Sequence, residues 1–127
     1  MKVKIDTREK FHVITIDESL ISANMTEKMD KVLLSLLHDN VKNVIINMKD
    51  IQKLDNAAAE RFLAIQQQFY EHGSSSFVLY ALQPGVRMVL TDLDLLELLN
   101  HTPTESEAMD IVQMEEIERE LGDIEEI

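Results

Sequence analysis

The pattern of apolar and polar side chains predicts strands that alternate with helices. Residues Val3–Arg8 and Phe11–Ile16 mix β-branched and polar residues, as strands do when one face or edge meets water. Val44–Ile46 and Phe77–Leu82 are continuous apolar runs, which are typical of strands covered on both faces. We therefore expect these two runs to form neighbouring inner strands of one sheet.

Apolar residues at three- and four-residue spacing predict two helices between these strands, over residues 25–38 and 56–72. Asn24 would cap the first helix, and Glu27 would reach back to it in a capping box. Asp55 would cap the second helix, and Gly73 would end it in a left-handed conformation. We expect both helices to pack on one face of the sheet.

The segment after Leu82 predicts two more helices. Gln83-Pro84-Gly85 opens a short one, with proline in its first turn. Residues 95–99 fit either a short strand or a helical turn. Residues 105–121 predict a last helix in which Ala108, Ile111 and Met114 are packed while the acids face water.

The order of these elements defines an α/β fold with a mixed four- to five-stranded sheet and helices packed mainly on one face. Residues 1–127 show neither a linker nor an internal repeat. We expect one domain, with an acidic helical extension at about 105–127.

Charge and composition exclude several classes of function. The net charge is −12, and residues 105–127 hold ten acids against Arg119 alone. Such a balance disfavours nucleic acids and anionic membrane surfaces as partners. The chain has no cysteine and no apolar run near the ~20 residues of a membrane span, so we expect a cytoplasmic protein without membrane insertion.

Catalytic and cofactor chemistry has little support in the sequence. The four histidines are scattered without the convergent spacing of a metal site. The three glycines are isolated, so they form no phosphate cradle. The serines of residues 74–76 lack an evident base and oxyanion donor. We expect no enzyme activity, no metal and no cofactor.

The most informative segment runs from Asn43 to Tyr70, NVIINMKDIQKLDNAAAERFLAIQQQFY. An apolar strand leads through a polar loop to Asp55 and Asn56, which open a helix. A helix N-terminus at such a place attracts anions and often carries function. The first turn, however, is Ala57-Ala58-Ala59 and has no hydroxyl. The alanines are either good helix formers or a lost modification site.

Three segments together resemble the STAS domain, the fold of anti-sigma factor antagonists, over roughly residues 3–115. They are NVIINMKDIQKLD, FVLYALQPGVRMVL and HTPTESEAMDIV. The family switches by phosphorylation in an Asp-Ser-Ser-Gly motif. Here Asp55 matches the aspartate, Asn56 the first serine, Ala57 the phosphoacceptor and Ala58 the glycine. The resemblance therefore implies a degenerate phosphosite at Ala57. It also leaves two interpretations of Asp55 open, a helix cap or a partner contact.

The resemblance implies a bacterial protein-interaction module in transcription regulation. Its partner would be an anti-sigma factor of the serine-kinase type or a related regulator, docked without the phosphorylation switch. A second hypothesis is a subunit that partners an ABC-type ATPase in lipid transport. The docking surface would combine the loop Asp50–Asn56, the first turns of helix 56–72 and the adjacent edge near Glu18–Asn24. Its expected partner-binding residues are Ser22, Asn24, Asp50, Lys53, Leu54, Asp55, Asn56, Ala57, Ala58 and Glu60.

The acidic last helix has three interpretations. Its charged face could simply be solvated, or it could dock a basic partner. Its apolar residues beyond Ile117 exceed what a small sheet domain needs, which also suggests a second copy of the chain and hence a homodimer.

Overall fold

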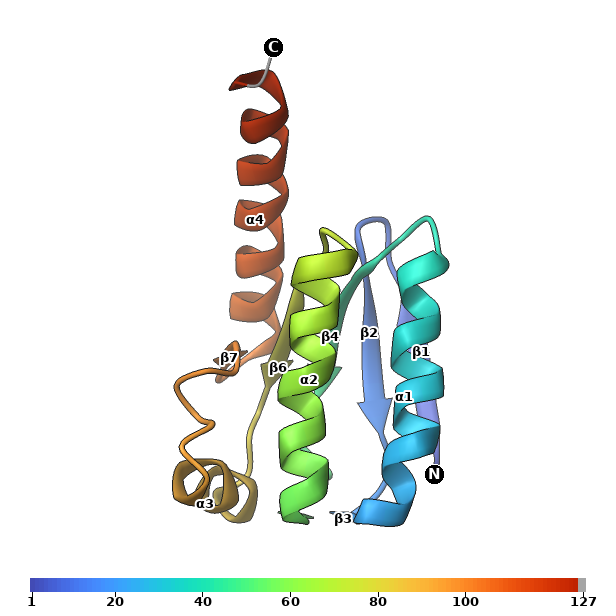
Figure 1. The fold of residues 1–127 in the computed structure, drawn as a ribbon, viewed down its shortest axis with the longest axis vertical. Coiled ribbons are helices and arrows are strands. Elements are labelled where there is room, and N and C mark those ends of the chain that lie inside the picture. The colour runs from blue at the N-terminus through green and yellow to red at the C-terminus, as the bar shows by residue number, and fades with distance from the viewer. Residues whose placement is uncertain (126–127) are drawn as a thin grey trace.

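The computed structural model describes residues 1–125, with side chains described as far as residue 122. Within this part of the chain, five strands form a mixed sheet in the order β1-β2-β4-β6-β7 (Figure 1). The strands are β1 (Val3–Thr7), β2 (Phe11–Ile16), β4 (Asn43–Asn47), β6 (Phe77–Tyr80) and β7 (His101–Thr102). The pair β1–β2 is antiparallel and the other pairs are parallel. This confirms the predicted α/β fold class and its mixed sheet.

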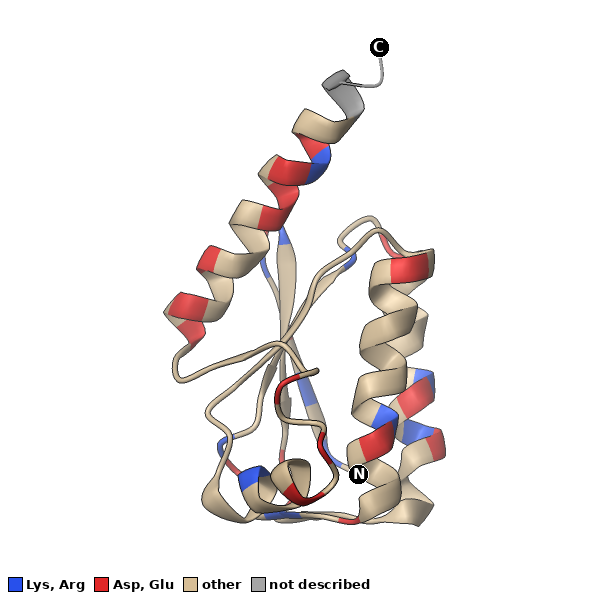
Figure 2. Cartoon of the chain, turned by 60° about the vertical axis from the view of Figure 1, so that its left-hand side comes forward, with Lys and Arg blue, Asp and Glu red and all other residues tan. Residues whose placement is uncertain are grey.

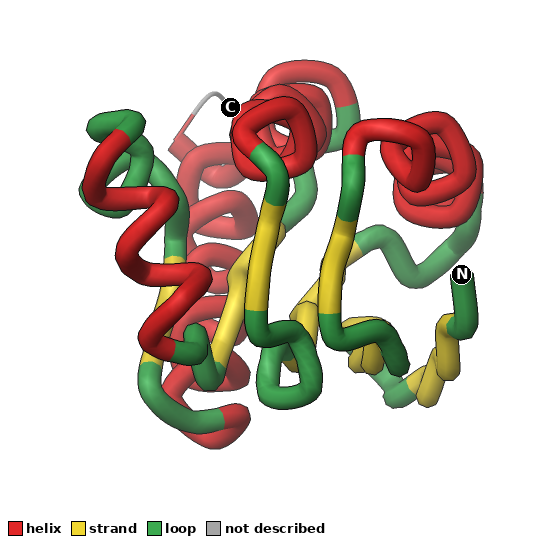
Figure 3. Tube along the Cα trace, turned by 90° about the horizontal axis from the view of Figure 1, so that it is seen from below, coloured by secondary structure: helices red, strands yellow, loops and turns green. Residues whose placement is uncertain are grey.

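Helices cover both faces of the sheet unequally. The helices α1 (Thr26–Ser35) and α2 (Asn56–His72) lie side by side on one face, as the end view in Figure 3 shows. The larger core lies beneath them and also takes in side chains of α3 (Pro84–Asp92). The helix α4 (Glu105–Glu125) packs on the other face, over a smaller core. The prediction that helices 25–38 and 56–72 share one face is confirmed.

The continuous apolar runs are neighbouring inner strands, as predicted. β4 pairs in parallel with both β2 and β6, and all five of its residues are buried. β6 ends at Tyr80 rather than Leu82, because Ala81 adopts a left-handed conformation with φ of 61°. Residues 95–99 form a helical turn, the second of the two predicted alternatives, in which the Leu95 carbonyl accepts hydrogen bonds from the Leu98 and Leu99 amides at 3.0 and 3.1 Å. The short strand β7 follows this turn.

The predicted capping box at Asn24 is wrong. Asn24 lies inside a 3₁₀ turn, Ala23–Met25, and α1 begins after it at Thr26. The Asn24 side-chain oxygen accepts a hydrogen bond from the Ser22 hydroxyl at 2.7 Å. A capping residue needs an extended backbone, and the chain has already turned before α1 starts.

The predicted left-handed Gly73 is also wrong. Its φ is −102°, and the left-handed residue is the next one, Ser74, with φ of 48°. Gly73 is required for close packing instead, because a Cβ there would overlap the side chain of Leu37. The end of α2 therefore packs against Leu37, which lies in the 3₁₀ turn that follows α1.

The last helix forms as predicted, but its packing differs. Ala108 and Val112 are buried in the core with Ile45 and Val78, and Ile111 is half-buried. Met114 was expected to pack and is instead 61% exposed, because the body-facing side of α4 continues through residues 108 and 112. Ile124, the last apolar residue of the predicted stripe, and the end of the extension at 126–127 lie outside the described side chains and residues.

Two glycines give a matched test of backbone packing. A Cβ on Gly85 would overlap the backbone carbonyl oxygen of Gln52, whereas a Cβ on Gly122 would meet nothing within 4 Å. We expect Gly85→Ala to lower the free energy of unfolding by about 1–3 kcal/mol. Gly122→Ala should raise it by about 0.5 kcal/mol, because alanine favours helix. Urea denaturation measures both, and equal effects would contradict the packing described.

Candidate functional site

A second, two-stranded sheet joins two loops at the end of the main sheet where β2 and β4 finish. The strands β3 (Leu20–Ile21) and β5 (Lys53–Leu54) pair in parallel, Leu20 with Lys53 and Ile21 with Leu54. The Ser19 carbonyl accepts hydrogen bonds from the Gln52 and Lys53 amides at 2.7 and 3.0 Å. The structure thereby brings the edge near residues 18–24 beside the loop at 50–56.

Asp55 connects this pairing to the start of α2. It occupies the N-cap position with an extended backbone, as predicted, but its side chain makes no bond to its own helix. Its carboxylate accepts a hydrogen bond from the Ala23 amide at 3.0 Å, and its own amide donates to the Ile21 carbonyl at 2.9 Å. Asp55 therefore holds the two loops together, which local sequence could not show.

The expected partner-binding residues differ in their exposure. Leu54 and Ala58 are buried, so their side chains support the surface from beneath. Ser22 and Asp50 are half-buried. The others are exposed, and we call them the α2 surface: Asn24, Lys53, Asp55, Asn56, Ala57 and Glu60.

Sequence reasoning missed two neighbours of the α2 surface. Leu20 lies within the predicted edge near residues 18–24 but was not among the expected partner-binding residues; it is apolar yet 41% exposed, and it pairs with Lys53. The first turn of α3 lies against the loop before β5, since Gly85 abuts the Gln52 carbonyl. The apolar pair Leu20–Ile21 and the Pro84-Gly85 dipeptide were the available signals, but neither reveals which segment it contacts.

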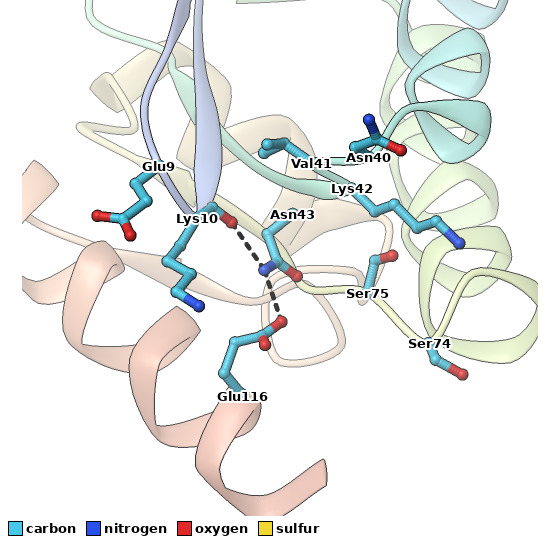
Figure 4. Close-up of a pocket in the computed structure, with 9 residues that line it drawn as sticks. All are labelled: Glu9, Lys10, Asn40, Val41, Lys42, Asn43, Ser74, Ser75 and Glu116. Carbon is cyan, nitrogen blue, oxygen red and sulfur yellow. Dashed lines mark hydrogen bonds between the residues drawn. The ribbon is translucent and has the colours of Figure 1, made fainter. Parts of the chain in front are cut away.

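The opposite end of the sheet holds a polar cavity of about 240 Å³, drawn in Figure 4. At its centre, the side-chain nitrogen of Asn43 donates to the Lys10 carbonyl at 2.9 Å and to Glu116 Oε1 at 2.8 Å. The Asn43 side-chain oxygen accepts from the Ser76 amide at 2.8 Å. Because these polar atoms already join β4, α4 and two loops, the arrangement acts as a structural clamp.

Two further contacts anchor α4 to the body. The Arg119 guanidinium donates to Glu116 at 2.9 Å and to the Ser76 hydroxyl at 2.7 Å. The Tyr70 hydroxyl donates to the Glu115 carboxylate at 2.8 Å and accepts from the side-chain NH₂ group of Asn100 at 2.8 Å. Burial raises the pKa of Tyr70, and the hydrogen bond and negative charge of Glu115 raise it further.

Residues 1–125 offer neither a metal site nor a membrane-spanning helix. His, Asp and Glu side chains form no group of three or more that could hold a metal ion in this range. No helix within it has the length and apolar character needed to cross a bilayer.

Comparison with known proteins assigns the chain to a family. A family model described as the STAS domain matches residues 2–108, and the chain therefore belongs to the STAS domain family. The resemblance in the sequence is thus confirmed. No curated protein gives a significant match to the chain.

Solved structures of anti-sigma factor antagonists share the fold. One from Mycobacterium paratuberculosis has a TM-score of 0.75 and 13% identity, covering 88% of this chain and 93% of its own. A candidate antagonist from Thermotoga maritima has a TM-score of 0.73 and 17% identity, covering 87% and 94%. Unphosphorylated SpoIIAA, an anti-sigma factor antagonist, has a TM-score of 0.68 and 19% identity, covering 88% of this chain and 96% of its own. At these identities the likeness concerns the fold.

The position of Asp55 gives a test of the site's architecture. Asp55→Ala removes the acceptor for the Ala23 amide, and we expect the free energy of unfolding to fall by about 1–2 kcal/mol. Asp55→Asn keeps an acceptor oxygen and should lose less than half of that. Chemical denaturation measures both variants. If Asp55→Ala is as stable as the parent, Asp55 does not hold the loops together.

Tyr70 gives a test of the α4 anchor. Tyr70→Phe removes the hydroxyl between Glu115 and Asn100, at an expected cost of about 1–3 kcal/mol. Because folding raises the pKa of Tyr70, the unfolded chain loses this proton first, near pH ~10. The parent's stability should therefore fall as the pH rises above this value, and less steeply in Tyr70→Phe. Parallel pH curves for both proteins would contradict this.

Proposed function

We propose that this STAS domain is a non-catalytic interaction module that docks a regulatory protein through the α2 surface. The observation that carries the proposal is the β3–β5 pairing, which places exposed residues of two loops beside the first turn of α2. Three chain segments thus form one rigid surface at one end of the sheet. Such a surface suits recognition of a folded partner, because little ordering is needed on binding.

The family supports the class of partner. The chain belongs to the STAS domain family, and its fold is that of solved anti-sigma factor antagonists. The partner proposed here is an anti-sigma factor of the serine-kinase type or a related regulator. On this proposal, the protein acts in bacterial transcription control in the cytoplasm.

The absence of a hydroxyl at Ala57 determines how this docking would be regulated. Ala57 is exposed in the first turn of α2, where the family carries its phosphoacceptor, and its methyl group cannot be phosphorylated. A phosphate at such a position acts by adding bulk and negative charge to the partner surface. Binding would therefore be constitutive, or governed by the amount of partner, instead of following a phosphate cycle at this residue.

Ala57→Asp tests the proposal. An acid near a helix N-terminus is locally favourable, so the fold should remain intact. In a packed interface the new charge should cost about 2 kcal/mol or more, a loss of roughly 30-fold in affinity. The measurement is calorimetric titration with the partner that copurifies from the native cell, with circular dichroism to check folding.

Gln67→Asp is the matched control. Gln67 is exposed on the same helix but beyond its first turns, so its new charge should leave the affinity within about twofold. If Ala57→Asp binds as tightly as the parent and Gln67→Asp, the partner does not use the α2 surface. The anti-sigma antagonist interpretation would then fail.

A further inference from the structure

The outward side of α4 carries an apolar stripe that packs against nothing in the core. Met114, Ile117 and Leu121 are 61%, 56% and 53% exposed. Their spacing of three and four residues places them on one side of the helix. Ala108 and Val112, which are buried against the sheet, lie on the opposite side. The helix thus has two apolar sides, of which only one is used by the fold.

The stripe lies on the second half of α4 (Glu105–Glu125), the helix whose end projects beyond the sheet. Figure 1 shows α4 extending past the ends of β2, α1 and α2, at the end of the molecule opposite to β3. A groove of about 270 Å³ runs beside Ile117, between α4 and the turn joining β1 to β2. Two acids and one base line it, with two uncharged residues beside Ile117: Glu116, Glu120, Lys10, Val112 and Gln113. An apolar side chain from outside could therefore pack beside Ile117.

Charge around the stripe indicates the kind of partner. Residues 105–120 contain seven acids and one base, Arg119. The acids run along α4 in Figure 2. The Arg119 guanidinium already binds Glu116 and Ser76, so it does not neutralise the outward acids. Glu118 and Glu120 neighbour the stripe in sequence, and both are exposed.

This charge disfavours a second copy of the chain. Two α4 helices packed stripe to stripe would place acid opposite acid, which is unfavourable at an interface. An anionic lipid surface would be repelled in the same way. A helix that carries apolar residues flanked by Lys and Arg would bury the apolar side chains of the stripe and pair with the acids beside it.

We propose that Met114, Ile117 and Leu121, with the flanking acids of α4, form a second docking surface for a basic amphipathic helix of a protein partner. This α4 stripe is separate from the α2 surface, because the two lie at opposite ends of the sheet. A partner bound at the α2 surface leaves the α4 stripe free. The protein can therefore hold two binding segments at once.

The test uses a synthetic helical peptide with leucines at three- and four-residue spacing and lysines on its other faces. A second peptide of the same composition has the leucines shuffled, so it keeps the charge but loses the apolar side. We expect the full chain to bind the amphipathic peptide at least about tenfold more tightly than the shuffled one, measured by fluorescence anisotropy. Higher salt should weaken both interactions.

Paired variants assign the binding to the α4 stripe. Ile117→Ser with Leu121→Ser should lower the affinity for the amphipathic peptide by at least about tenfold. Met88→Ser with Leu98→Ser is the matched control, since these side chains are 64% and 57% exposed elsewhere, and it should bind like the parent. Ala57→Asp should also bind like the parent, which separates this test from that of the α2 surface.

Three outcomes would overturn the proposal. Equal affinity for the two peptides would show attraction by charge alone. Equal binding by the Ile117→Ser, Leu121→Ser variant and the parent would place the peptide elsewhere. Sedimentation of the parent as a dimer that this variant converts to a monomer would assign the α4 stripe to a second copy of the chain.

Discussion

The parallel pairing of β3 with β5, two residues each, is the constraint on which the candidate site depends. β2 and β4 are parallel neighbours, so they deliver the following loops to the same end of the sheet. Without further bonds, these loops would be free to separate. The Ser19 carbonyl, bound by two amides of the other loop, and the Asp55 carboxylate, bound by the Ala23 amide, fix them side by side. Asp55 is thereby fixed, and the first turn of α2 begins at the next residue, so its position is fixed as well.

Two kinds of interaction hold α4 to the rest of the protein, apolar packing near its start and polar contacts further along. Near its start, the small apolar residues Ala108 and Val112 pack on the sheet. Further along, contact with the body is polar, through Glu115 to Tyr70 and through Arg119 to Ser76. Polar anchors fix the direction of a helix without requiring it to lie flat on the core. This leaves the other side of the helix free to present apolar side chains to solvent.

The sheet and its inner strands could be predicted from the sequence because burial on two faces leaves a continuous apolar run. The start of α2 could also be predicted from the sequence, since Asp55 and Asn56 separate a strand from a helical pattern. The contact made by the Asp55 side chain could not be predicted, because its partner is the backbone amide of Ala23, which is distant in sequence.

The errors share a physical cause. Periodicity shows that α4 is apolar at 111, 114 and 117, but it cannot tell which of two apolar sides faces the sheet. In the same way, the residues at Asn24 fit a cap, and only the path of the chain from β3 makes it a 3₁₀ turn instead. Gly73 permits a left-handed conformation, whereas the tertiary requirement was room for Leu37. Long-range packing decided each case.

Amide hydrogen exchange on the complex with the copurified partner tests the central claim most directly. The claim is that the loops at 18–24 and 50–56 and the first turn of α2 form one docking surface. The account predicts that exchange in residues 18–24 and 50–60 slows together when the partner binds. Unchanged exchange in both segments, with protection confined to other parts of the chain, would contradict it.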